Sequence, residues 1–308
     1  RTMVILDIFA SRAITKEGKI QVELAQLKYR ASRLAGLGKS LSRLGGGIGT
    51  RGPGEKKLEM DRRLIRERIS RLKKELKDVE RHRELIRGQR KQSGLKVAAL
   101  VGYTSAGKSS IENALTQAGV LEDAMLFSTL DTTTRALTLD NTQEILLTDT
   151  VGFINKLPHH LVEAFKSTLE EAKYADIIVH VVDASNPQMD AQMHVVYETL
   201  RQLGAEGKPV IILFNKQDKV ENPVNHKDLQ ADYSIATSAK TGQGLEEFKQ
   251  ALLEIIRKEQ IYIERLYDFS EAGKIQLIRS KGQLLSEEYV PEGIEVKAYV
   301  PQDIYGRL

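Results

Sequence analysis

The chain has 308 residues, of which 41% are hydrophobic and 29% charged, a composition typical of a folded protein with at least one sizeable core. It has no cysteine, no secretory leader and no long apolar run, so we expect no disulfide, no cysteine-ligated metal, no membrane span and a cytoplasmic location. The net charge of +4 is uneven: residues 55–91 hold fifteen Lys and Arg against eight Asp and Glu, a net of +7, which leaves about −3 elsewhere. This concentration predicts one basic surface that faces a polyanion.

The N-terminal segment is apolar. Residues 2–10 predict a buried strand and residues 12–18 a turn, and because the first residue is Arg we interpret residues 1–18 as the remnant of an N-terminal α/β domain that begins earlier in a longer chain. From Ile20 to Leu34 apolar residues recur at steps of three and four, which predicts an amphipathic helix. Residues 45–54 hold too many glycines for any regular element and predict a loop.

A second, longer helix is predicted from about residue 55. Its apolar residues recur every seven positions, with two more at the alternate positions of the repeat: Leu58, Ile65, Leu72, Val79 and Ile86, then Ile69 and Leu76. This spacing is typical of a coiled-coil seam, so residues 19–94 predict an antiparallel helical hairpin with the glycine-rich loop near its tip. The polar residues 89–94 are interpreted as a linker.

Strand and helix patterns alternate over residues 95–257. The predicted strands are 96–101, 136–139, 144–148, 177–182, 209–214 and 234–237, and the predicted helices are 107–118, 160–174, 188–203 and 243–258. This order indicates a doubly wound α/β domain with a mostly parallel sheet. Residues 258–308 predict a strand at 260–266, a helix at 270–280 and strands at 282–289 and 293–300, hence a small α+β domain in which Tyr262 and Tyr267 serve packing.

A phosphate-binding loop joins the first of these strands to the first helix. Its residues are Gly102, Tyr103, Thr104, Ser105, Ala106, Gly107, Lys108 and Ser109. The glycines let backbone N–H groups converge on phosphates at a helix N-terminus. We expect Lys108 to bridge the β- and γ-phosphates and the Ser109 hydroxyl to bind Mg²⁺.

Two further motifs complete the nucleotide site. The run Asp149, Thr150, Val151 and Gly152 follows a hydrophobic strand, where an Asp holds Mg²⁺ through water and the glycine N–H contacts the γ-phosphate. The run Asn215, Lys216, Gln217 and Asp218 selects guanine, because the Asp carboxylate accepts two hydrogen bonds that adenine cannot supply. The run Ser238, Ala239 and Lys240 is placed to approach the guanine O6. Together these motifs predict a GTPase.

Catalysis needs two more groups. A threonine must cover the γ-phosphate, and residues 127–135 offer several without a choice among them. Phe153 stands where many GTPases carry a glutamine that orients water. Because a phenyl ring cannot do this, we expect slow intrinsic hydrolysis that a partner or another group accelerates.

The whole chain resembles the HflX family of translational GTPases. The resemblance rests on the runs that begin at Leu6, Gly45, Gly102, Phe127 and Asp149, and the glycine-rich loop together with Asp-Thr-Val-Gly-Phe-Ile is specific to the family. It implies that Thr129 binds Mg²⁺ and completes catalysis with Lys108 and Gly152. It also implies nucleotide contacts from the segment Phe127, Ser128, Thr129, Leu130 and Asp131.

The resemblance further implies function and partners. Family members bind the large ribosomal subunit through the hairpin and split stalled ribosomes, and some relatives protect against antibiotics. We expect rRNA contacts from loop residues Gly47, Gly49, Thr50, Arg51 and Gly52, and a monomer. ATP binding is described for the family's N-terminal region, which begins well before Arg1, and is not carried over.

The sequence departs from the family at three positions. Ser110 replaces a usual Thr, Glu112 replaces an apolar residue, and Thr132 replaces a Pro that would restrict the switch. Glu112 either costs packing or lies at the surface.

Other interpretations stay open. The charged helix could be only a solvated face, and His159 and His160 favour a loop or helix start over a metal site. The alternatives to a splitting factor are a GTP-dependent rRNA-binding assembly factor and a regulatory GTPase that binds a protein through the hairpin.

Overall fold

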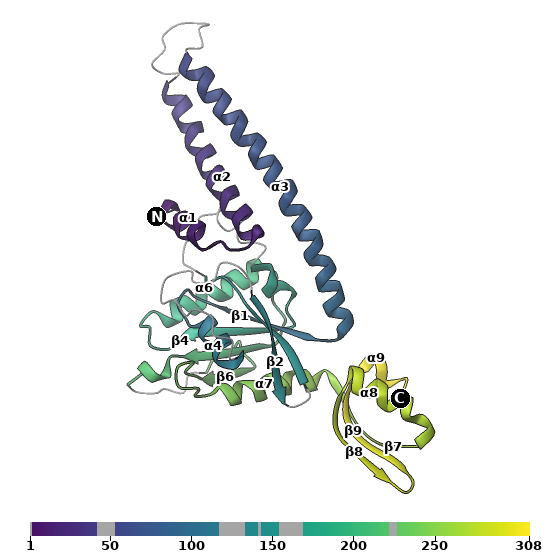
Figure 1. The fold of residues 1–308 in the computed structure, drawn as a ribbon. Coiled ribbons are helices and arrows are strands. Elements are labelled where there is room, and N and C mark those ends of the chain that lie inside the picture. Colours follow the sequence, from purple (N-terminus) through teal and green to yellow (C-terminus); the bar gives the residue numbers. More distant parts are fainter. Residues whose placement is uncertain (1, 42–52, 117–132, 141–142, 154–168, 222–226) are drawn as a thin grey trace.

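The computed structural model describes residues 2–41, 53–116, 133–140, 143–153, 169–221 and 227–308. Figure 1 shows three parts in chain order: a long helical hairpin, a central sheet with helices on both faces, and a small sheet with helices at the C-terminal end. Within the described ranges, no helix is long and apolar enough to cross a membrane.

The first element is a helix, α1 (Thr2–Arg12), so the strand predicted for residues 2–10 is wrong. Ile5, Leu6 and Phe9 are buried whereas Met3 and Val4 are exposed. A spacing of one and four residues puts the buried side chains on one helical stripe, which alternation in a strand would not do. An apolar run this short fits either element, and the packing of this stripe against α2 and the central sheet decides for the helix.

The hairpin is formed by α2 (Lys16–Leu41) and α3 (Pro53–Ser93), which lie side by side in Figure 1. Leu72 of α3 packs against Ile20 and Leu24 of α2, as the seven-residue spacing predicts. The linker predicted for residues 89–94 is wrong, because α3 continues to Ser93. The predicted turn over 12–18 is shorter, since α1 reaches residue 12 and α2 starts at residue 16. The glycine-rich residues 45–52 lie outside the described part.

The central sheet has the strand order β2-β3-β1-β4-β5-β6. All pairs are parallel except β2 with β3. The strands are β1 (Lys96–Gly102), β2 (Thr133–Asp140), β3 (Gln143–Asp149), β4 (Ile177–Asp183), β5 (Val210–Asn215) and β6 (Tyr233–Ala236). The predicted mostly parallel sheet is confirmed, and its carboxyl ends point to one edge where ligands bind in such folds.

Helices cover both faces of this sheet. They are α4 (Lys108–Thr116), α6 (Met189–Gln202) and α7 (Leu245–Lys258), together with a helical segment at residues 169–174. Ala98 and Leu100 of β1 face a core with α4 and α7, whereas Ala99 and Val101 face a core with α1, α6 and the 169–174 segment. The buried strands between these layers explain the near-continuous apolar runs. The rest of the helix predicted for 160–174 lies outside the described residues.

The small C-terminal domain is α+β, as predicted. Its antiparallel sheet has the order β7-β9-β8. The elements are β7 (Gln260–Tyr267), α8 (Ala272–Lys281), β8 (Gln283–Val290), β9 (Gly293–Pro301) and α9 (Gln302–Tyr305). Tyr267 is buried in its core, and Tyr262 contacts Tyr299 with ring centroids 5.4 Å apart. Both tyrosines therefore serve packing.

Candidate functional site

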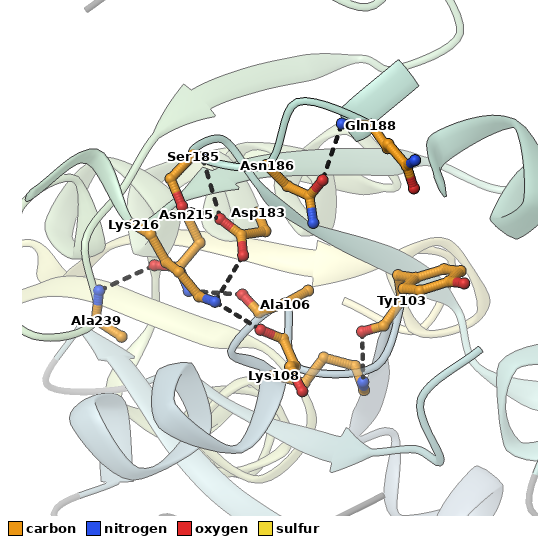
Figure 2. Close-up of polar contacts among 11 residues, drawn as sticks. Tyr103, Ala106, Lys108, Asp183, Ser185, Asn186, Gln188, Asn215, Lys216 and Ala239 are labelled. Carbon is orange, nitrogen blue, oxygen red and sulfur yellow. Dashed lines mark hydrogen bonds and ion pairs between the residues drawn. The ribbon is translucent and has the colours of Figure 1, made fainter. Parts of the chain in front are cut away.

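Three of the predicted nucleotide motifs, all within the described residues, lie at the carboxyl edge of the central sheet. The phosphate-binding loop follows β1, Asp149 ends β3, and Asn215 ends β5. Figure 2 shows that side chains from the ends of β4 and β5 point toward the phosphate-binding loop. The parallel sheet thus brings together residues that are more than a hundred positions apart in the chain.

Two glycines are needed at this edge for steric reasons. Gly107 has φ of +100°, and a Cβ on it would lie 2.2 Å from the Asn215 Nδ2. A Cβ on Gly152 would lie 2.8 Å from the Thr104 Cα and 3.1 Å from the Lys108 Nζ. Any larger residue would push the phosphate-binding loop away from its neighbours.

Lys108 lies inside the loop with 6% of its surface exposed. Its Nζ is 3.4 Å from the carbonyl oxygens of both Gly102 and Tyr103, at the long end of hydrogen-bond distance. Burial lowers the pKa of the Lys108 ammonium, and the nearby Asp149 carboxylate opposes this shift. A cation so weakly held is well placed to exchange these carbonyls for a phosphate.

Ser109 and Asp149 form the oxygen-rich corner of the site. The Ser109 Oγ donates a hydrogen bond of 2.6 Å to the Asp149 Oδ2. A hydroxyl beside a buried carboxylate is the donor set that Mg²⁺ prefers, so these residues fit that ion. The next residue, Thr150, is anchored by a 2.7 Å hydrogen bond from its Oγ1 to the Leu100 carbonyl.

Phe153 packs into the core, with 2% of its surface exposed. Its backbone pairs with the phosphate-binding loop: its N–H donates to the Gly102 carbonyl at 3.0 Å, and its carbonyl accepts from the Thr104 N–H at 2.8 Å. The ring therefore faces the protein interior.

The side chain of Asn215 bridges two loops. Its Nδ2 donates to the Ala106 carbonyl at 2.9 Å, and its Oδ1 accepts from the Ala239 N–H at 3.0 Å. Lys216 follows with φ of +67°, and its Nζ donates to the Ser105 carbonyl at 2.7 Å. The loops that follow β1, β5 and β6 are thereby held in one arrangement.

Asp218 is the carboxylate predicted to read the base. The Ser238 Oγ donates to its Oδ1 at 2.7 Å, and this bond lowers the pKa of Asp218, which keeps the carboxylate ionised. Gln217 between the motif residues is buried, and its Nε2 donates to the Phe214 carbonyl. Its side chain thus supports the turn, whereas Lys240 is exposed at the rim.

Asp183, at the end of β4, is a site residue that the sequence motifs do not include. Its Oδ2 lies 2.6 Å from the Lys216 Nζ, and its Oδ1 accepts from the Ser185 N–H and Oγ (Figure 2). The signal for it was available, because a carboxylate that ends the apolar strand beside β1 and β5 must lie at the same edge.

Glu112 is buried with 2% of its surface exposed, so the surface interpretation of this residue is wrong. The switch residues 127–132, the loop residues 47–52 and both His159 and His160 lie outside the described part of the chain. Among the described residues, no group of three or more His, Asp and Glu is arranged to hold a metal.

The comparisons with known proteins agree with this geometry. Residues 12–90 match the family described as "GTP-binding GTPase Middle Region", and residues 97–216 match the one described as "50S ribosome-binding GTPase". The crystal structure of a GTP-binding protein from Sulfolobus solfataricus in complex with GDP aligns with a TM-score of 0.53 and 27% identity, over 83% of this chain and 72% of that one.

Sequence similarity to two relatives covers nearly all of this chain and about seven tenths of each relative. GTPase HflX of Lacrimispora saccharolytica is 65% identical over 100% of this chain and 73% of its own length. GTPase HflX of Escherichia coli is 40% identical over 98% of this chain and 69% of its own length. The chain therefore belongs to the HflX family of GTPases, and GTP is the substrate that it hydrolyses.

Proposed function

We propose that this GTPase binds the large ribosomal subunit through the helical hairpin and separates stalled or idle ribosomes into subunits. The observation that carries the proposal is the direct continuity of α3, a long basic helix, with β1, the strand that leads into the phosphate-binding loop. The GTPase domain, proposed to span residues 95–257, is thereby joined to an element suited to a polyanion.

In this proposal the nucleotide site works as follows. Lys108 leaves the two loop carbonyls to bridge the β- and γ-phosphates, and Gly152 donates its N–H to the γ-phosphate. Asp218 reads guanine while Lys216 packs along the base. Ser109 and Thr129 would hold Mg²⁺, with Asp149 acting through water, and the ion supplies charge neutralisation between the phosphates when bound.

Hydrolysis needs help from outside the described site. The ring of Phe153 is buried, so the side chain after Gly152 cannot orient the attacking water. A slow basal rate that rises on the ribosome follows, because the partner would complete the catalytic arrangement. The protein would then retain its GTP conformation until it reaches the ribosome.

A cluster of ion pairs joins the hairpin to the GTPase domain. Arg87 of α3 lies 2.6 Å from Glu171 of the helical segment 169–174, and Arg83 lies 2.9 Å from Glu17 of α2 and 3.8 Å from Glu171. Arg87 also stacks over the Tyr174 ring at 4.1 Å. Because segment 169–174 is the described helix that follows Gly152 in the chain, a nucleotide-driven shift of it would be felt by α3.

The test measures GTP hydrolysis with and without purified ribosomes, together with sedimentation of the subunits. A combined variant with Arg66→Gln, Arg71→Gln and Lys74→Gln removes three exposed cations of α3. Its matched control, Lys227→Gln with Lys281→Gln and Arg307→Gln, removes the same charge from exposed sites elsewhere.

Ribosome-stimulated hydrolysis and subunit separation, both weakened by the α3 variant and not by the control, support the proposal. Binding to precursor subunits without separation of intact ribosomes would favour the assembly factor instead. Stimulation that is equal in all three proteins would contradict the role given to the hairpin.

A further inference from the structure

Two residues of the nucleotide site have an unusual backbone conformation. Among the described residues that are not glycine, only Ser105 and Lys216 have φ in the left-handed region, at +62° and +67°. A residue with a Cβ adopts this conformation at a cost in free energy, so it persists where neighbouring contacts hold it. The side chain of Ser105 is exposed, so its own packing does not hold it. The contacts made by the Ser105 backbone are therefore informative.

One ammonium group joins Ser105 to the end of β4. The Lys216 Nζ donates a hydrogen bond of 2.7 Å to the Ser105 carbonyl and lies 2.6 Å from the Asp183 Oδ2 (Figure 2). These three residues form a clasp, Asp183–Lys216–Ser105, which crosses the carboxyl edge of the sheet. It runs from the end of β4, by way of the residue after β5, to the loop after β1.

The carboxylate of Asp183 supplies the negative charge of the clasp. Its Oδ1 accepts from the Ser185 N–H at 3.1 Å and from the Ser185 Oγ at 2.6 Å, which leaves the Oδ2 directed at Lys216. The Asp183 and Lys216 side chains are only 15% and 24% exposed, so water screens this pair less than a surface ion pair. Without the carboxylate, the ammonium would be better hydrated in solvent, and its bond to the Ser105 carbonyl would weaken.

The conformation of Ser105 matters because of its place in the phosphate-binding loop. Ser105 lies two residues before Gly107, which is also left-handed with φ of +100°. Residues in this conformation turn successive backbone N–H groups toward one point, and such a concave arrangement binds anions. A loop that is held in this shape has fewer conformations to lose when phosphates bind. The charge of Asp183 is thereby linked to phosphate binding through Lys216 and Ser105.

We propose that Asp183 is a positioning residue that, through Lys216, holds the Ser105 backbone in its left-handed conformation and so preshapes the phosphate-binding loop. The inference rests on the proposed assignment of this loop to the nucleotide phosphates, and it does not depend on the proposed binding to the ribosome. GTP and GDP share their α- and β-phosphates, so the clasp should favour both nucleotides by a similar factor.

A double-mutant cycle between Asp183→Asn and Ser105→Gly tests this link. Glycine adopts the left-handed conformation without steric cost, so Ser105→Gly removes the strain that the clasp offsets. Titrations with fluorescent GDP and a fluorescent non-hydrolysable GTP analogue measure the affinities, and the melting temperature of each variant reports its folding. The matched control is Asp190→Asn, which removes the same charge from an exposed position in the first turn of α6.

We expect Asp183→Asn to bind both nucleotides roughly three- to tenfold more weakly, the scale of one hydrogen bond, at an unchanged melting temperature. In the Ser105→Gly background the same change should cost less than about twofold, because the loop then adopts its shape without the clasp. Asp190→Asn should bind both nucleotides as the unmodified protein does.

An equal loss in both backgrounds would overturn the inference, because Asp183 would then act without the strain at Ser105. Unchanged affinity in Asp183→Asn, or a loss confined to one nucleotide, would overturn it as well. Lys108→Ala separates this failure from that of the proposed site. If Lys108→Ala weakens binding of both nucleotides and Asp183→Asn does not, only the clasp is refuted. If neither variant weakens binding, the proposed nucleotide site fails too.

Discussion

Replacement of Asn215 by Ala should loosen the nucleotide site without disturbing the sheet. The side chain is 1% exposed and joins the phosphate-binding loop to the loop after β6 through its bonds to the Ala106 carbonyl and the Ala239 N–H. The variant leaves the buried Ala106 carbonyl and the half-buried Ala239 N–H without a partner, at about 1–3 kcal/mol for the buried group and less for the half-buried one. Because water can enter the vacated space, we expect about 2–3 kcal/mol in total, which corresponds to roughly 30- to 150-fold weaker GDP binding.

Fluorescent GDP titration measures this loss, and Asn186→Ala is the matched control. The Asn186 Oδ1 accepts only a local bond from the Gln188 N–H in a surface turn, as Figure 2 shows, so we expect that variant to bind GDP within about twofold of the unmodified protein. GDP affinity that is unchanged in Asn215→Ala, or reduced equally in both variants, would refute the argument that this side chain holds the two loops together.

Three further changes have defined outcomes. Asp183→Asn removes the charge that holds Lys216, and GDP should dissociate roughly three- to tenfold faster in stopped-flow traces while the melting temperature stays constant. Burial, with Asp149 nearby, raises the pKa of Glu112 from 4.5 to about 7, so the folded protein holds this proton more tightly than the unfolded chain does. The free energy of unfolding should therefore fall as the pH rises from about 4.5 through 7. Urea titrations at several pH values measure this slope, and Glu112→Gln should flatten it. Glu171→Ala removes the carboxylate that Arg83 and Arg87 share, and should lower the free energy of unfolding by about 1–3 kcal/mol in the same urea assay. Glu170→Ala is the neighbouring control.

The GTPase sheet is predictable because each motif follows an apolar run that is too short to be a buried helix and therefore indicates a strand. Strands β1, β4 and β5 are buried on both faces, so their sequences are nearly continuous in apolar residues, and a glycine or a polar residue marks the end of each. The heptad spacing of α3 is an equally clear signal. It predicts the contact between the two hairpin helices, in which Leu72 is buried. Local patterns suffice where one period dominates.

The errors lie where no single period dominates. Residues 2–10 are apolar over most of their length, and the packing of Ile5, Leu6 and Phe9 against neighbouring elements selects the helix. Residues 89–94 are polar, which favours a linker, but polar residues are good helix formers when a helix already exists to extend, and α3 reaches Ser93. In both cases the deciding interaction comes from outside the segment.

Contacts between distant segments limited the prediction of the site in the same way. Asp183 is 33 positions from Lys216, and Glu112 is 21 positions from Thr133, so neither pair forms a local motif. The sheet order places the first pair at one edge, and the packing of α4 beside β2 makes the second. Motifs predict the residues that touch the nucleotide, whereas the residues that hold the motifs in place depend on topology.

Part of the positive charge of α3 is neutralised by ion pairs within the protein. Arg68 pairs with Glu23 of α2, and Arg83 and Arg87 pair with Glu17 and Glu171, so these cations are neutralised within the protein. Paired cations release few counterions on binding RNA, and the salt dependence of rRNA binding should therefore be shallower than a count of fifteen basic residues suggests. The end of α3 nearest β1 thus anchors the hairpin to the GTPase domain, and we expect the cations further out to carry the contact with a polyanion.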